Sequence, residues 1–288
     1  MNWFSLSLLC AFSLASADTL TKWRLADYSE EELVLARLVV PAALLSPILL
    51  YHPLPYLPLQ FWMWIAGAIP LEIVAMLLYM QAIKHSPLYL TLPYLAFTPI
   101  FTALTGYFLL GERIGITGIS GIALITAGAF LLNVRHIGKG ILEPFKAILR
   151  EKGSRMMMAV ALIYGLTSVL VKGALQYCPP ITFGAFYYLL VGTASLLYFM
   201  SKNHGIPASI FRKPQWVLAA ALLSMVMALS HFLALDATKA AYMIAVKRTS
   251  LLFGVIFGAI LFGEKDFRLH FLAGVIMVAG VALISTMV

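Results

Sequence analysis

Ionisable side chains lie deep inside long apolar runs of this sequence. Glu72 lies two residues after Pro70 in the middle of one run, and the adjacent cations Lys247 and Arg248 lie well inside another. A charge at the centre of a lipid bilayer costs at least about 2.5–3.5 kcal/mol, so it normally faces a partner or a cavity. Two roles are open for Glu72: pairing with a neighbouring helix, or holding a proton or ligand. The two cations suit an anionic or zwitterionic ligand.

Other polar residues within or beside these runs are further candidates for a binding or coupling site. Lys22 and Lys172 lie near the ends of two runs, where a long side chain can also snorkel to the membrane surface. Asp18 precedes Lys22 by four residues, the spacing of an ion pair on one helix face. His231 suits either a proton relay or a satisfied structural histidine. The remaining candidates are Arg37, Tyr94 and Tyr164, although tyrosines in membrane proteins are commonly lipid-facing anchors.

Motifs for nucleotide, metal or acyl chemistry are absent. The sequence contains no GxxxxGK[ST], HExxH or GxSxG, and its two cysteines, Cys10 and Cys178, form no metal-binding or CxxC spacing. We therefore predict no ATP drive, no metal, no cofactor and no enzymatic activity.

The elements that must position these residues are membrane helices. Hydrophobic residues make up 62% of the chain and charged residues 11%, against roughly 45–50% and about 25% in soluble domains. Apolar runs of about 20 residues match the bilayer core, where the backbone must satisfy its own hydrogen bonds as helix. The predicted spans are 3–23, 32–51, 61–83, 87–110, 114–134, 156–177, 181–200, 215–235, 240–262 and 267–287. The run at 1–17 ends in Ala-Ser-Ala like a cleaved signal, but no basic residue precedes it, so we predict a retained first span.

One connector is long and basic. Residues 135–155 carry six Lys or Arg residues and place apolar side chains at helical spacing, the pattern of an amphipathic helix on a membrane surface, although a plain linker is compatible with it. With the net charge of +8, this predicts contact with membrane lipid and not with nucleic acid. Positive charge also favours placing connectors 135–155 and 202–213 in the cytoplasm, with both termini outside.

The chain repeats itself at a shift of 152 residues. The segment 98–113, TPIFTALTGYFLLGER, coincides with 250–265, SLLFGVIFGAILFGEK. Small residues at spacing four include Gly106 and Gly258, a signal for close helix packing. The turns Gly111-Glu112 and Gly263-Glu264 follow, and each glutamate can cap the next helix. Five spans per copy force opposite orientations, so we predict an all-α membrane protein of ten helices in two inverted five-helix repeats, 1–134 and 156–288, joined by 135–155.

The two Gly-Glu segments resemble the EamA domain of the drug/metabolite transporter superfamily. Each is followed by a glycine-containing helix, with Gly121 and Gly128 in the first copy and Gly274 and Gly280 in the second. Arg37 also looks like the family's arginine in its second span. The resemblance covers essentially the whole chain, and it implies ten helices around a central cavity, transport without ATP and cytoplasmic termini, opposite to the placement that the charges favour.

Together these features predict a multi-pass carrier in a bacterial inner membrane. It would move a small polar metabolite, amino acid-like or anionic, by alternating access, with or without proton coupling. Three other classes stay open: an exchanger of two metabolites, a sensor or lipid-moving protein without metabolite flux, and a membrane-embedded enzyme. Substrate identity, direction, coupling ion and oligomeric state are not set by the sequence.

Overall fold

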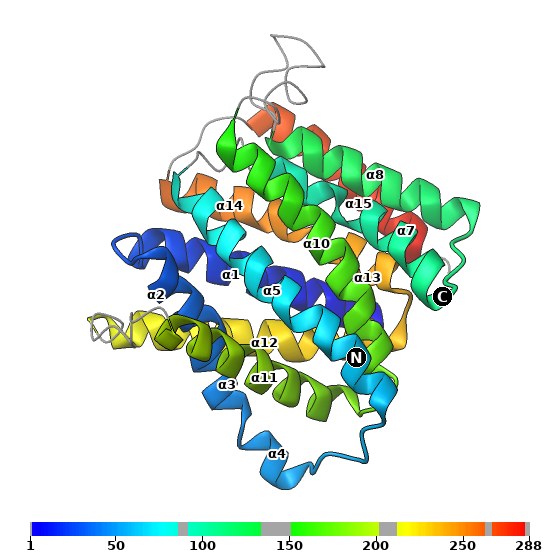
Figure 1. Ribbon diagram of the computed structural model, residues 1–288. Coiled ribbons are helices and arrows are strands. Elements are labelled where there is room, and N and C mark those ends of the chain that lie inside the picture. The colour runs from blue at the N-terminus through cyan, green and yellow to red at the C-terminus, as the bar shows by residue number, and fades with distance from the viewer. Residues whose placement is uncertain (1, 86–91, 134–150, 202–211, 263–266, 286–288) are drawn as a thin grey trace.

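The structure is a computed structural model, and it describes residues 2–85, 92–133, 151–201, 212–262 and 267–285. Every regular element in these ranges is helical, as predicted (Figure 1). The first half contains α1 (Trp3–Arg24), α2 (Glu30–Val34), the π-helical turn η1 (Leu35–Val39), α3 (Val40–Leu45), α4 (Ile48–Tyr51), α5 (Leu59–His85), the 3₁₀ turn η2 (Leu92–Phe97), α7 (Thr98–Leu110) and α8 (Ile116–Asn133). The second half contains α10 (Lys152–Leu175), α11 (Pro180–Ser201), α12 (Pro214–Ala237), α13 (Ala240–Lys247), α14 (Ser250–Phe262) and α15 (Phe267–Ser285).

Seven helical segments in the described ranges are long and apolar enough to cross a membrane. They are Trp3–Arg24, Glu30–Tyr51, Leu59–Ala82, Lys152–Leu175, Pro180–Ser201, Pro214–Ala237 and Ala240–Gly258. Three of the ten predicted spans correspond to shorter apolar helices, Tyr94–Leu110, Ile116–Leu131 and Leu272–Ser285. The chain is therefore an integral multi-pass membrane protein.

Three predicted spans are interrupted, where continuous helices were expected. In the second predicted span, 32–51, Pro41 has no N–H to donate to the carbonyl of Arg37. The preceding turn is π-helical, and the N–H of Val40 donates to the carbonyl of Leu35. The fourth begins as the 3₁₀ turn η2 before α7. In the ninth, α13 and α14 are separated at Arg248-Thr249, where the Thr249 hydroxyl donates to the carbonyl of Val246 at 2.7 Å.

The helix bounds reproduce the internal repeat. A shift of 152 places α7 on α14, and a shift of 150 places the segment Glu30–Tyr51 on α11. The interruptions before α7 and α14 therefore fall at equivalent positions in the two copies.

Helices of the two copies pack against each other in matching pairs. α1 lies along α12 and α5 lies along α10, which Figure 1 shows side by side, while α8 pairs with α15. The end of α1 lies at the start of α12, because Lys213 donates to the carbonyl of Arg24 at 2.9 Å. The end of α10 lies instead at the end of α12, where Lys172 donates to the carbonyl of Thr238. The repeat-related helices α1 and α10 thus run in opposite directions, and a two-repeat architecture fits.

The basic connector lies almost wholly outside the described residues. α10 begins at Lys152, so the last four residues of the range predicted as connector, 152–155, belong to this long helix. The amphipathic helix predicted for the rest of 135–155 remains a prediction.

Candidate functional site

A polar cluster joins three segments of the first repeat. The guanidinium Nη1 of Arg37 on η1 lies 2.9 Å from Oδ1 of Asp18 on α1, and Tyr79 on α5 donates to Oδ2 of Asp18 at 3.0 Å. Arg37 is 5% exposed and Asp18 is 27% exposed. The π-helical turn presents Arg37 toward α1, and such turns are frequent at functional sites. The structure therefore pairs Asp18 with Arg37 rather than with the expected i,i+4 partner, Lys22.

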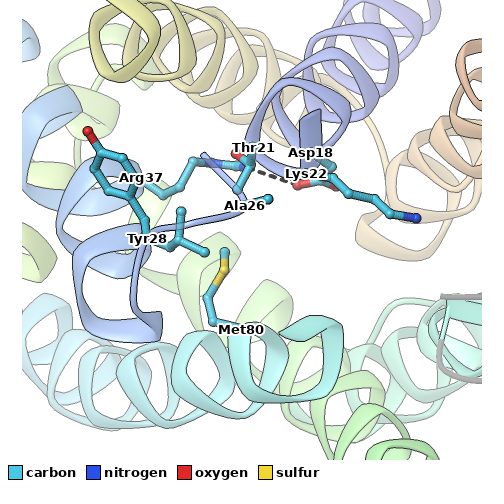
Figure 2. A pocket seen from close by; sticks show the side chains of 8 residues that line it. Asp18, Thr21, Lys22, Ala26, Tyr28, Arg37 and Met80 are labelled. Carbon is cyan, nitrogen blue, oxygen red and sulfur yellow. Dashed lines mark hydrogen bonds and ion pairs between the residues drawn. The ribbon is translucent and has the colours of Figure 1, made fainter. Parts of the chain in front are cut away.

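A cavity of about 160 Å³ opens beside this pair. Figure 2 shows Arg37 and Asp18 joined at its wall, with the Lys22 side chain extending away from them. The lining residues are Asp18, Thr21, Lys22, Ala26, Tyr28, Leu33, Arg37 and Met80. Lys22 is exposed and belongs to the cavity lining, which places this predicted site residue at the mouth of the polar cluster.

A second group of polar side chains lies deeper in the bundle. Lys247 Nζ on α13 lies 3.3 Å from Nδ1 of His231 on α12. When Lys247 is charged its ammonium can only donate, so Nδ1 is then the acceptor of a neutral imidazole. Glu72 on α5 is partly buried beside the hydroxyl of Thr167 on α10, and Lys247 lies within its electrostatic reach. Glu72, Lys247 and His231 are thus brought together from three helices.

Arg248 is the most isolated cation of the cluster. It is 4% exposed, its Nε has no hydrogen-bond partner, and within the described ranges no ion pair reaches it. Asp18, Tyr79 and Tyr164 lie close enough to act on its charge. Arg248 is therefore within reach of Asp18 in the first group and adjacent in sequence to Lys247 in the second.

The charged residues of the cluster have no charged counterparts at the equivalent positions of the other repeat. At the shift of 152, Glu72 corresponds to Ser224 and the Lys247-Arg248 pair corresponds to Leu95-Ala96. Tyr79 and His231 occupy equivalent positions, and both touch the cluster. A symmetric scaffold therefore carries an asymmetric site.

The opposite end of the bundle is closed by what we call the clasp, formed by Glu112, Lys172, Thr238 and Ala240. Glu112 Oε1 lies 2.7 Å from Nζ of Lys172, with exposures of 10% and 15%. The same carboxylate accepts from the backbone N–H of Ala240, at 3.0 Å from Oε2 and 3.2 Å from Oε1. Glu112 therefore caps α13 in the other repeat rather than the helix that follows it, and Lys172 is paired rather than snorkelling.

Two glycines give Glu112 its position. Gly111 ends α7 with a φ of 67°, in the left-handed region that favours glycine. The N–H of Glu112 then turns back to the carbonyl of Gly106 at 3.1 Å, and a Cβ on Gly106 would lie 3.1 Å from Oε2 of Glu112. The predicted Gly-Glu motif thus builds one half of the clasp.

The small residues at spacing four form two ladders that are packed differently: Thr98, Thr102 and Gly106 in α7, and Ser250, Gly254 and Gly258 in α14. Beside the first, Thr105 donates to the carbonyl of Gly165 on α10 at 3.0 Å, and a Cβ on Gly165 would lie 3.2 Å from the backbone nitrogen of Thr102. Gly254 on α14 has open space beside it, and Gly258 is partly exposed. The ladder of the first copy is therefore a tight helix contact, and that of the second is looser.

The remaining predicted residues differ in where they lie. Tyr94 on η2 is buried beside Ser154 at the start of α10. Gly263 and Glu264, the second Gly-Glu turn, lie outside the described residues. Tyr164 is within the cluster, with its hydroxyl 3.9 Å from Sδ of Met76.

An ion network at the cavity end was not singled out from the sequence. Lys213 Nζ lies 2.7 Å from Oδ1 of Asp27, and Arg212 Nη2 lies 3.5 Å from Oε2 of Glu32. The hydrogen bond from Lys213 lowers the pKa of Asp27, which lies in the loop after α1. The sequence shows these opposite charges in two separate segments, but only the packing of α1 on α12 brings the segments together.

Within the described ranges, no group of three His, Cys, Asp or Glu residues could hold a metal.

The fold and this site define a class: a multi-pass helical membrane protein built from two repeats around a buried charged cluster. A sequence model of the EamA-like transporter family matches residues 1–134 and 151–286. The chain belongs to that family of transporters.

The comparison with solved structures supports the fold. One protein crystal structure is similar with a TM-score of 0.74 and 17% sequence identity, covering 99% of this chain and 96% of that chain. No curated protein matches the sequence.

Proposed function

We propose that the protein is a secondary transporter that moves a small polar metabolite, amino acid-like or anionic, across the membrane by alternating access. Family membership supports the transporter class. The observation that carries the rest is one charged cluster that adjoins a cavity at one end of the bundle and is closed by the clasp at the other.

The proposed architecture is ten membrane-crossing segments in two inverted repeats, 1–134 and 156–288. The opposite directions of α1 and α10 and the matched bounds of α7 and α14 support it. Inverted repeats give a carrier two related gates, because each copy can repeat at one surface what its mate does at the other.

The packing corresponds to one state of such a cycle. At the clasp end, α7 is held tightly against α10 and α13. At the cavity end, the Arg37–Asp18 pair is partly exposed and Gly254 of α14 has free space beside it. Opening of the clasp together with closure of α14 would expose the cluster to the other side.

Glu72 is our candidate for proton coupling. It is a carboxylate in the middle of a membrane-crossing helix, next to Thr167 and in reach of Lys247. Protonation would release Lys247 from this attraction, and His231, which accepts from Lys247, offers a second proton site.

We place the protein in a bacterial inner membrane, with the cavity end toward the cytoplasm. The connectors 135–155 and 202–213 hold most of the loop cations. They precede α10 and α12, which both begin on the cavity side, and positive charge favours the cytoplasmic face. A reporter fused to Val288 should then be active outside; activity only inside would reverse the placement.

The test is uptake by purified protein in liposomes that are offered a whole-cell metabolite extract, with and without a pH gradient. Accumulation of a defined compound only with the gradient supports proton coupling. A requirement for a metabolite inside the vesicles makes the protein an exchanger. Glu72→Gln should abolish the pH dependence while the exposed control Glu31→Gln keeps it; unchanged pH dependence in Glu72→Gln would remove Glu72 from the scheme.

A further inference from the structure

The break between α13 and α14 holds a buried cation with which no described residue forms an ion pair. Arg248 is 4% exposed, and its Nε has no hydrogen-bond partner. A buried charge without a partner strongly destabilises a fold, so an unpaired one marks a position that a ligand can complete. The equivalent residue in the first repeat is Ala96, so the helix break itself does not require an arginine.

The buried charges of the cluster also sum to a positive value. Three cations, Arg37, Lys247 and Arg248, face two carboxylates, Asp18 and Glu72. Arg37 is matched by Asp18 at 2.9 Å, and Lys247 is within reach of Glu72. The positive charge left over is that of Arg248, so the described cluster lacks one negative charge.

The cluster also retains polar groups for a second part of a ligand. The hydroxyl of Tyr187 is buried without a hydrogen-bond partner, and it lies within reach of Glu72. An inorganic anion on Arg248 would leave this group unused, whereas an organic acid with a further polar group would engage it. The planar guanidinium also matches the two oxygens of a carboxylate better than a spherical ion.

We infer that Arg248 binds the carboxylate of a singly charged organic acid, with the rest of the molecule directed toward Tyr187 and Glu72. The approach in this proposal is the cavity that Asp18 lines, because the Asp18 carboxylate is within reach of Arg248, which is itself not among the lining residues. This inference rests on the proposed function for the identity of the ligand as the transported molecule, but the anion site can be tested without transport.

The experiment measures thermal stabilisation of the purified full chain in detergent. The probes are a panel of 2-amino and 2-hydroxy monocarboxylates, the primary amides of the same compounds, and sodium chloride. We expect at least one carboxylate to raise the Tm while its amide and chloride do not. Arg248→Gln should weaken apparent binding about 10- to 100-fold, the range for a lost charge-assisted hydrogen bond. Arg248→Lys should recover part of it, and Arg155→Gln, which removes an exposed arginine, should bind as the unmodified protein does.

Several results would overturn the inference. Equal stabilisation by chloride would make this an inorganic anion site, and equal stabilisation by the amides would remove the charge requirement. No stabilisation by any acid, or full binding in Arg248→Gln, would also reject it. The same compounds are then offered to liposomes. Carboxylate binding without flux would leave the site in place and reject transport, whereas flux of neutral or cationic compounds alone would keep transport and reject this site.

Discussion

The carboxylate of Glu112 and the ammonium of Lys172 lie 2.7 Å apart and connect the end of α7 in one repeat to the end of α10 in the other. Glu112 also accepts from Ala240 N at the start of α13, so a single side chain holds three helices at one end of the bundle. The pair is mostly buried, which makes it stronger and more geometrically demanding than a surface ion pair.

Removing the charge of Glu112 should loosen this end of the protein. Glu112→Gln leaves Lys172 without its counter-ion, and we expect a loss of about 2–3 kcal/mol in the free energy of unfolding, the upper range for a hydrogen bond to a charged group. Chemical denaturation in detergent measures it. The double variant Glu112→Gln with Lys172→Met should lose less than the sum of the two single variants. Additive losses would show that the pair is not coupled.

The Asp18–Arg37 pair should contribute more to the free energy of unfolding than the exposed Asp27–Lys213 pair at the same end of the bundle. Asp18→Asn leaves Arg37 buried without a counter-ion, and we expect a loss of roughly 3 kcal/mol, the low end for a broken buried pair because Asp18 keeps 27% exposure. Asp27→Asn is the matched control, because its pair with Lys213 is 48% and 40% exposed and solvent screening should make its loss much smaller. Equal losses would mean that Arg37 is neutralised by another group.

Tyr79 should act by positioning Asp18 rather than by holding charge. Tyr79→Phe removes the 3.0 Å hydrogen bond to Oδ2 and keeps the ring, so we expect about 1 kcal/mol of destabilisation. If the cluster binds the transported molecule, KM should rise several-fold in a liposome assay while maximal flux changes less. A fall in maximal flux with an unchanged KM would assign Tyr79 to a later step of the cycle.

The glycine contacts should differ in their tolerance of a methyl group. A Cβ on Gly128 would lie 2.7 Å from the carbonyl oxygen of Ala273 and 2.9 Å from the backbone nitrogen of Met277, so α8 and α15 must separate. We expect Gly128→Ala to cost about 1–3 kcal/mol. Gly254→Ala meets no atom of the described residues within 4 Å and should be neutral or slightly stabilising. Melting curves of the two variants test this, and equal effects would contradict the tight packing of α8 on α15.

Cys178 should react slowly with alkylating reagents. Burial raises its pKa from an ordinary value near 9 to about 11, which leaves roughly 100-fold less thiolate at neutral pH. The alkylation rate of the Cys10→Ser variant, in which Cys178 is the remaining cysteine, should still be rising at pH 10. A plateau below pH 9 would show that the loop between α10 and α11 exposes the thiol.

The sequence was sufficient for the class of protein, because apolar length and repeated spacing are local properties. Membrane helices need only an apolar run of the right length, and the two Gly-Glu segments revealed both the repeat and the family. It also marked the residues of the charged cluster, since a charge such as that of Glu72 or Arg248 inside an apolar run has few roles in lipid. What it could not supply was the continuity of the helices, because the breaks at η1 and at Arg248-Thr249 depend on hydrogen bonds within the folded segments.

The partners of the charged residues were decided by the tertiary structure alone. Asp18 pairs with Arg37, nineteen positions away, and not with Lys22 one turn along its own helix. Glu112 caps a helix that begins 128 positions later. Charge attraction is the same for any opposite pair, so the sequence leaves many pairings open. The packing of α1 on α12 and of α7 on α10 and α13 fixes which groups come within 3 Å, and it leaves Arg248 without an ion pair among the described residues.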